Sequence, residues 1–279
     1  MQSPSRGRRL DAVPGPFTPR TPRVAAARRL HRRRDREATG RFLAEGPQAV
    51  REALARPGTV TELFGTPAAL DRYADLAAQA ARADVPVSEV TDEGLAALAE
   101  TVAPQGLVAA CRHLDIPLDT ALSRRPRLIA VLAEIRDPGN AGTVLRTADA
   151  AGAGTVVFAG DAVDPYNGKC VRASAGSLFH VDVVRAPDPR HVVDALRAVG
   201  LSVFATTGYG DTDLDELADA GRLATPTAWL FGSEAHGLPE ELTAAADARV
   251  RVPLHGRAES LNLAAAAAVC LYASARALR

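Results

Sequence analysis

The run LIAVLAEI at residues 128–135 is apolar at nearly every position, which is the pattern of a strand buried on both faces of a parallel sheet. The same half of the chain contains further short apolar segments, which we predict as strands at 155–160, 179–184, 201–207, 227–232 and 248–253. Helices are predicted between them at 141–152, 188–199, 239–246 and 261–278. Strands that alternate with helices in this way predict an α/β domain with a parallel sheet.

Three strand-to-helix loops of this domain are rich in glycine and small polar residues. They are DPGNAGTVLRTADAAGAG at 137–154, LFGSEAHGL at 230–238 and VPLHGRAESLNLAAAAA at 252–268. In an α/β sheet, ligands bind at the carboxyl ends of the strands. The polar residues at or beside these loops are Asn140, Arg146, Glu234, Ser260 and Asn262. Their positions predict one convergent pocket.

The first two loops also have purely structural interpretations. In this interpretation, Asn140 has no role except to cap a helix that starts at Ala141. Arg146 is then simply an i,i+3 partner of Asp149 on that helix. Glu234 can belong to an ordinary connection between a strand and a helix. A carboxylate at the end of a buried strand nevertheless needs a polar partner, because its desolvation is costly.

The third loop leads into a helix whose interior, LAAAAAVCLYASA, is small and apolar almost all round. Ser260 or Asn262 can cap this helix, which is the structural alternative to a role in binding. A helix of this composition must be covered on most of its sides. We expect its own sheet to cover it, with a second subunit as a further candidate.

The stretch KCVRASAGSLF at 169–179 contains the single lysine of the chain, Lys169, and Arg172 three residues later. Two cations beside a turn of small residues suit a phosphate or a nucleotide backbone. The alternative is an ordinary surface turn.

Residues 38–113 also alternate between predicted strands and helices. This pattern predicts a smaller α/β domain that precedes the α/β domain described above. Its expected strands include FLAEG near residue 42 and the segments 60–64, 86–90 and 106–111. Its expected helices follow Gly46-Pro47, where Pro57-Gly58 ends the first of them, and span 69–83 and 92–99. We predict residues 114–126 as the linker to the larger domain, which covers 127–279.

Residues 1–37 are predicted to be a basic and largely disordered arm. Eleven arginines and two aspartates give residues 1–36 a charge of +9, and because the whole chain is formally neutral the remainder carries −9. This asymmetry is typical of a protein that contacts a polyanion. Residues 25–36 can form a basic helix, and the alternative is a solvated charged face.

Several classes of protein are disfavoured. Cys111, Cys170 and Cys270 are far apart and have no histidine at ligand spacing, which argues against zinc and against a disulfide framework. No apolar stretch predicts a membrane span or a signal peptide, so we expect a cytoplasmic protein. Aromatic residues make up only 4% of the chain, which disfavours an aromatic platform for single-stranded RNA.

Common catalytic and nucleotide-binding motifs are also missing, including the P-loop, the nucleophile elbow and HExxH. Gly208 and Gly210 follow a predicted strand, as in a dinucleotide-binding loop, but the acidic residues after them would repel a pyrophosphate. His236 and His255 are isolated, and we assign them no role.

Taken in order, NAGTVLRTADAAGA, KCVRASAGSLF, LFGSEAHGL and VPLHGRAESLNLAAAAA resemble the SpoU (TrmH-type) RNA ribose 2′-O-methyltransferases of the SPOUT superfamily. The resemblance is strong over 127–279. Over 41–111, FLAEGPQAVREAL and APQGLVAAC resemble more weakly the ribosomal-protein-like substrate-binding domain that often precedes the catalytic domain.

The resemblance implies a C-terminal SPOUT domain with a trefoil knot, an obligate homodimer formed through it, and S-adenosylmethionine as cofactor. General rules of chain topology alone would argue against a knot. The implied catalytic residues are Asn140, Arg146, Glu234, Ser260 and Asn262. The residues implied to line the methyl donor are Thr206, Gly208, Leu230, Gly232, Val252, Leu254 and Leu261. We expect Arg28, Arg29, Arg32, Arg33, Lys169 and Arg172 to bind RNA.

The expected function is therefore 2′-O-ribose methylation of RNA, with large-subunit ribosomal RNA favoured because of the front domain. Arg146 is either the base or a clamp on the neighbouring phosphate, since a guanidinium loses its proton only with difficulty. Two alternatives stay open, a transfer-RNA methyltransferase of the same fold and a catalytically silent RNA-binding dimer. The sequence does not separate housekeeping modification from antibiotic resistance. We expect no metal and no membrane partner.

Overall fold

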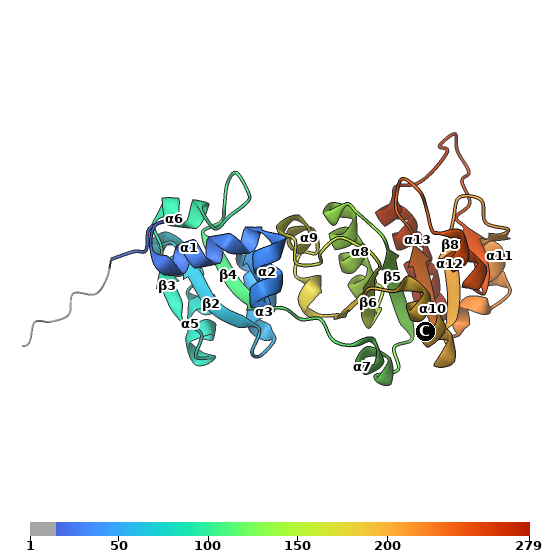
Figure 1. Ribbon diagram of the computed structural model, residues 1–279, viewed down its shortest axis with the longest axis horizontal. Coiled ribbons are helices and arrows are strands. Elements are labelled where there is room, and N and C mark those ends of the chain that lie inside the picture. The colour runs from blue at the N-terminus through green and yellow to red at the C-terminus, as the bar shows by residue number, and fades with distance from the viewer. Residues whose placement is uncertain (1–14) are drawn as a thin grey trace, which may run out of the picture.

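A computed structural model of the chain describes residues 15–279, so the part of the predicted arm at 1–14 lies outside the described residues. The fold has two α/β units that follow one another along the long axis of the molecule (Figure 1). The N-terminal unit ends with β4 (Leu107–Arg112), and β5 (Leu128–Ala133) is the third strand across the seven-stranded sheet of the C-terminal unit.

The N-terminal unit is built on a mixed sheet in the order β1-β4-β2-β3, in which β4 is antiparallel to both of its neighbours and β2 is parallel to β3. The other strands are β1 (Arg41–Glu45), β2 (Val60–Gly65) and β3 (Val87–Glu89). The helices that follow them are α3 (Pro47–Ala55), α4 (Pro67–Arg72), α5 (Ala74–Arg82) and α6 (Asp92–Ala96). The single helix predicted at 69–83 is therefore two helices, divided at Tyr73.

The predicted disordered arm is wrong for residues 22–37, which form helices packed on the first sheet. These are α1 (Pro22–Arg28), the 3-10 helix η1 (Arg29–His31) and α2 (Arg33–Thr39). Val24, Ala27 and Leu30 recur every three residues and are all buried, which gives this basic segment one apolar face. That face joins a core with Phe64 and Val108, and the arginines between its members stay outside.

The two faces of the first sheet are covered by different helices. Phe64 and Val108 pack under α1, whereas Leu63 and Ala109, their neighbours along the strands, pack with the residues of α3 and α5. Successive side chains of a strand point to opposite faces. The basic segment α1–α2 therefore lies on one side of the unit and α3 and α5 on the other (Figure 1).

The C-terminal unit is a fully parallel sheet in the order β7-β6-β5-β10-β8-β11-β9, as the alternating pattern predicts. Its further strands are β6 (Thr155–Ala159), β7 (Asp182–Ala186), β8 (Ser202–Thr206), β9 (Thr212–Asp213), β10 (Thr227–Phe231) and β11 (Ala248–Arg251). Its helices are α8 (Pro138–Ala150), α9 (Gly168–Ala173), η2 (Ser177–Phe179), α10 (Pro189–Ala198), α11 (Leu214–Asp219), η3 (Arg222–Ala224), α12 (Glu240–Ala245) and α13 (Leu263–Ala277). The predicted linker contains a helix of its own, α7 (Leu118–Ser123).

The order of the strands brings distant loops together. β5 pairs with β10, which comes almost a hundred residues later, and the register runs from Leu128 opposite Thr227 to Leu132 opposite Phe231. Because the two strands end side by side, the first two polar loops leave the sheet at the same edge. Along the described chain, no helix has the length and apolarity needed to cross a membrane.

A buried ion pair joins the two units. The Arg36 side chain on α2 and the Asp164 side chain after β6 are each only 4% exposed, and Asp164 Oδ2 accepts from Arg36 Nε at 2.8 Å and from Nη2 at 2.7 Å. Arg36 Nη1 also donates to the backbone oxygens of Leu30 and His31, both at 2.9 Å. A buried charge needs such complete pairing. The contact of Arg36 with Asp164, which we call the joint between the two units, therefore fixes α2 against the C-terminal unit.

Tyr166 adds further contacts beside the ion pair of Arg36 and Asp164. Its hydroxyl accepts from the backbone N–H groups of Leu114 and Asp115 at 2.6 and 2.7 Å and donates to Asp115 Oδ1 at 2.7 Å. Its ring stacks on His113, with the centroids 4.1 Å apart, and contacts Phe42 of β1. The start of the linker is thereby held to the C-terminal unit.

We expect Arg36→Ala to lower the free energy of unfolding by about 3–5 kcal/mol, because Asp164 would stay buried with an uncompensated charge. Urea unfolding followed by circular dichroism measures this loss. Arg33→Ala is the matched control, since Arg33 is exposed on the same helix and its loss should cost less than about 0.5 kcal/mol. Equal unfolding midpoints for the two variants would contradict the structural role given to Arg36.

Candidate active site

The first polar loop connects β5 to α8. Asp137 caps this helix, because its Oδ1 accepts from the backbone N–H of Asn140 at 2.7 Å and the helix begins at Pro138. The prediction that Asn140 caps a helix starting at Ala141 is therefore wrong. Since Asp137 takes the capping role, the amide side chain of Asn140 is left for other contacts.

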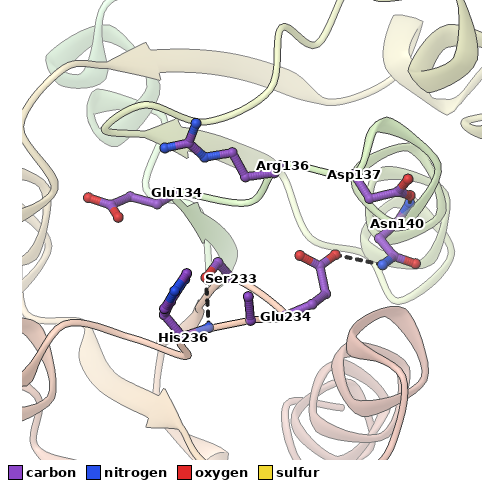
Figure 2. Close-up of a pocket in the computed structure, with 8 residues that line it drawn as sticks. Glu134, Arg136, Asp137, Asn140, Ser233, Glu234 and His236 are labelled. Atoms are coloured by element: carbon purple, nitrogen blue, oxygen red, sulfur yellow. Dashed lines mark hydrogen bonds between the residues drawn. The ribbon is translucent and has the colours of Figure 1, made fainter.

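Those contacts join all three predicted loops. Asn140 Nδ2 donates to Glu234 Oε1 at 2.6 Å, as Figure 2 shows, and Asn140 Oδ1 accepts from Asn262 Nδ2 at 3.2 Å. Asn262 Oδ1 in turn accepts from the backbone N–H of Ala264 at 2.9 Å, so Asn262 caps α13. Asn262 thus combines the structural and the site role that were posed as alternatives. We call this chain of hydrogen bonds the Asn140–Glu234–Asn262 relay.

The loop that carries Glu234 folds back on itself after β10. Ser233 N–H donates to the Gly237 oxygen at 3.1 Å, and Gly237 N–H donates to the Ser233 oxygen at 2.8 Å. A Cβ on Gly232 would lie 2.3 Å from the Gly237 carbonyl carbon, so only glycine allows this close approach. The turn presents Glu234 at its exposed tip.

A cavity of about 750 Å³ lies at the carboxyl ends of β8, β10 and β11. The sequence-predicted residues that line it are Thr206, Gly208, Gly232, Glu234, Val252, Leu254, Ser260, Leu261 and Asn262. Leu230 does not line it, because its side chain is buried in the core, although its backbone oxygen accepts from Thr206 Oγ1 at 2.8 Å. The prediction had missed Tyr209, His236 and Glu259, which also face the cavity.

Arg146 is not brought to this cavity by the single chain. It lies on the exposed side of α8, and within the described part of the chain its guanidinium has no hydrogen bond or ion pair. The alternative in which Arg146 pairs with Asp149 is wrong, because Asp149 pairs with His180 at 2.8 Å.

The two cations of the KCVRASAGSLF stretch are engaged within the protein. Lys169 Nζ lies 2.8 Å from Asp137 Oδ2 and, together with the Asn140 N–H, holds the pKa of the Asp137 carboxyl below its usual value. Arg172 pairs with Glu100 at 2.8 Å and with Glu45 at 3.6 Å, across the joint between the units. The stretch forms α9 and η2 rather than a surface turn.

The other predicted RNA-binding residues are open to solvent. Arg28, Arg29 and Arg32 are exposed, and no ion pair of theirs occurs in the residues that the structure describes. Arg33 is also exposed and lies 3.9 Å from Glu37. Among the same residues, no group of three or more His, Cys, Asp or Glu side chains is arranged to hold a metal ion.

The chain is similar to known RNA-modifying proteins along most of its length. Residues 127–272 match the SpoU rRNA methylase family, and residues 21–109 match the MRM3-like substrate-binding domain. The second match includes α1 and α2, which the sequence analysis had placed in the arm.

Several relatives are named as ribosomal RNA methyltransferases. The 23S rRNA (guanosine(2553)-2′-O)-methyltransferase RlmP of Bacillus subtilis is 34% identical over 88% of this chain and 92% of its own length. The 23S rRNA (uridine(2479)-2′-O)-methyltransferase of Streptomyces viridochromogenes is 37% identical over 62% of this chain and 61% of its own length.

A solved structure extends the likeness to three dimensions. The SpoU methyltransferase AviRb from Streptomyces viridochromogenes, in complex with the cofactor AdoMet, superposes with a TM-score of 0.80 at 31% identity, over 92% of this chain and 98% of that one. Both the family match and the extent of these similarities lead to one conclusion: the chain belongs to the SpoU rRNA methylase family.

Proposed function

We propose that this protein transfers the methyl group of S-adenosylmethionine to a ribose 2′-hydroxyl of large-subunit ribosomal RNA. The observation that carries the proposal is the Asn140–Glu234–Asn262 relay at the rim of the 750 Å³ cavity. The relatives named as 23S rRNA 2′-O-methyltransferases support the reaction and the substrate class. Action on ribosomal RNA also supports a cytoplasmic location.

The cavity suits S-adenosylmethionine in size and chemistry. Its volume falls within the range of about 300–1,000 Å³ that is typical of small-molecule sites. The side chains of Leu254 and Leu261, which are 41% and 39% exposed in the absence of a ligand, offer an apolar wall to an adenine. Glu234 and Glu259 place carboxylates where a sulfonium or an ammonium group can be accommodated. AdoMet-bound relatives of the same fold support this cofactor.

When bound, S-adenosylmethionine supplies a methyl group on a positively charged sulfur, and the protein must align a hydroxyl oxygen with it. The Asn140 amide holds Glu234 Oε1, which leaves the other carboxylate oxygen at the exposed tip of its loop to accept from the 2′-hydroxyl. Asn262 fixes the orientation of the amide, because it donates to Asn140 Oδ1. Such positioning accounts for much of the rate in a transfer between two bound reactants.

A second copy of the chain is proposed to cover α13. Ala265, Val269 and Tyr272 lie on one face of this helix, and the last two are 43% and 52% exposed. An apolar face that one chain leaves open is typical of a subunit interface. Arg146 lies on α8, which packs beside α13, so it acts at this dimer surface or on RNA bound there. The function of Arg146 as base or phosphate clamp stays a prediction. The trefoil knot of the C-terminal domain also stays a prediction.

The decisive experiment maps 2′-O-methyl groups in ribosomal and transfer RNA from cells with and without the protein. We expect a site in large-subunit ribosomal RNA to lose its methyl group when the protein is absent. A lost methyl group in transfer RNA would favour the transfer-RNA alternative. Unchanged maps, combined with calorimetry that detects no heat on titration with S-adenosylmethionine, would favour the silent RNA-binding dimer and refute the proposal.

Arg146→Ala should lower kcat by about a hundredfold or more, because a group that assists the departing proton or its charge is lost. Its affinity for S-adenosylmethionine should not change, since Arg146 does not line the cofactor cavity. Calorimetry and single-turnover methyl transfer measure the two quantities. Arg190→Ala, which changes an exposed arginine paired with Asp194 on α10, is the control. Full turnover in Arg146→Ala would refute a role for Arg146 in the reaction.

Replacement of Arg28, Arg29 and Arg32 by alanine should weaken RNA binding and flatten its salt dependence. Each lost phosphate contact removes about 0.7 from the slope of log K against log salt for single-stranded RNA, so the triple variant should lose roughly 2. The matched control replaces Arg51, Arg72 and Arg82, which are exposed on the helices α3, α4 and α5. Equal slopes for the two triple variants would show that the basic segment does not bind RNA.

A further inference from the structure

A second cavity, of about 410 Å³, lies against the relay and is distinct from the 750 Å³ cavity proposed for the cofactor. Glu134, Arg136 and Asp137 line it from the end of β5, and Asn140 lines it from α8. The segment Ser233–His236 lines both this cavity and the cofactor cavity. A molecule in the second cavity therefore meets Asn140 and Glu234 (Figure 2) and shares the Ser233–His236 wall with the cofactor cavity.

Glu134 offers this cavity a carboxylate with no partner in the described part of the protein. The other two carboxylates around the cavity already have partners. Asp137 forms an ion pair with Lys169, and Glu234 accepts a hydrogen bond from Asn140. The backbone of Glu134 has a φ of 57°, a left-handed conformation that is unfavourable for a residue with a side chain. Its N–H donates to the Ala159 oxygen at 3.0 Å, so pairing with β6 holds the residue in this conformation. Strain that is maintained in this way is typical of ligand clamps.

Arg136 and His236 supply the other groups that a nucleotide needs. The Arg136 side chain is 68% exposed and pairs only with the equally open Asp161, at 2.9 Å. Such an exposed pair is weak, so a phosphate can replace the aspartate. The His236 backbone is fixed by a hydrogen bond to Ser233 Oγ at 3.2 Å, while its imidazole makes no hydrogen bond to the described residues and faces the cavity (Figure 2).

We propose that the second cavity binds the acceptor nucleotide and selects guanosine. Glu134 accepts hydrogen bonds from the base, Arg136 contacts the adjacent phosphate, and His236 stacks on the ring. The 2′-hydroxyl then lies at Asn140 and Glu234, next to the cofactor cavity. This inference rests on the proposed function, because it names the nucleotide on which that reaction acts.

The choice of guanine follows from the chemistry of a carboxylate. A carboxylate only accepts hydrogen bonds, and its two oxygens suit two adjacent N–H donors. Guanine presents two such donors, N1–H and N2–H, on its Watson–Crick edge. Uracil has a single N–H between two carbonyl oxygens, which would repel Glu134. Adenine and cytosine each place a ring-nitrogen lone pair beside their donor. Relatives named for guanosine and for uridine both occur, so family membership does not decide the base.

The test uses the full-length protein and an RNA fragment that spans the methylated nucleotide, once mapping has located it. We expect that nucleotide to be a guanosine. Replacement of this guanosine by inosine, which lacks the N2 amino group, should lower kcat/KM about tenfold, because a hydrogen bond to a charged group is lost. In Glu134→Gln, kcat/KM on guanosine should fall about tenfold or more, and the preference for guanosine over inosine should shrink to less than about threefold.

Two controls separate recognition of the base from damage to the fold or the cofactor site. Glu134→Gln should bind S-adenosylmethionine with unchanged affinity, since Glu134 does not line that cavity. Glu241→Gln, an exposed glutamate on α12 that lines neither cavity, should behave as the unaltered protein. Arg136→Ala should raise KM for RNA and reduce the salt slope by about 0.7, with kcat nearly unchanged.

A mapped acceptor other than guanosine, equal rates on guanosine and inosine, or full activity of Glu134→Gln would each overturn the inference while the methyltransferase reaction stands. Absence of methyl transfer by the unaltered protein would instead refute the proposed function. The two failures are therefore distinguishable.

Discussion

The parallel pairing of β5 with β10 is the constraint on which the site depends. Leu132 and Phe231 lie opposite each other at the ends of these strands, so the loop with Asn140 and the loop with Glu234 leave the sheet together. The 2.6 Å hydrogen bond between the two side chains is possible only because the strands are in this register. A shift of one residue would turn every side chain of β10 to the other face and move Glu234 away. The buried strands therefore do more than form a core, since their register aligns the side chains of Asn140 and Glu234.

The sheet and the convergence of the three loops were predictable from the sequence because both follow from local patterns. A continuous apolar run such as 128–135 predicts a strand buried on both faces, and polar residues just after such strands predict a common edge. The relay of Asn140, Glu234 and Asn262 confirms that these residues are brought together. The capping role of Asp137 was missed, because Asp137 and Asn140 are both favoured helix caps and the helix begins at Pro138, three residues before the predicted start.

The basic segment shows where local patterns are insufficient. The composition of residues 1–37 predicted a largely disordered arm, with a basic helix or a solvated charged face left open for 25–36, whereas Val24, Ala27 and Leu30 give this segment a buried face. Arg36 is also buried, and its partner Asp164 is 128 residues away, so nothing nearby in the sequence distinguishes it from the exposed Arg33. Arg172 is similar: its sequence pattern assigned it to a phosphate, yet it pairs with Glu100 across the joint. The role of a charge depends on partners that only the tertiary fold provides.

The joint also fixes the proposed RNA-binding arginines relative to the candidate active site. Arg28, Arg29 and Arg32 precede Arg36 on one short segment, which Val24 anchors to the first sheet and Arg36 anchors to the C-terminal unit. The exposed arginines proposed to bind RNA are therefore held at a fixed position relative to the relay. Removal of residues 1–36 would eliminate Arg36 together with the exposed charges, and Asp164 would remain buried without its partner. Because such a deletion also disturbs the joint, only the replacement of exposed arginines with Arg36 kept in place isolates the proposed contribution to RNA binding.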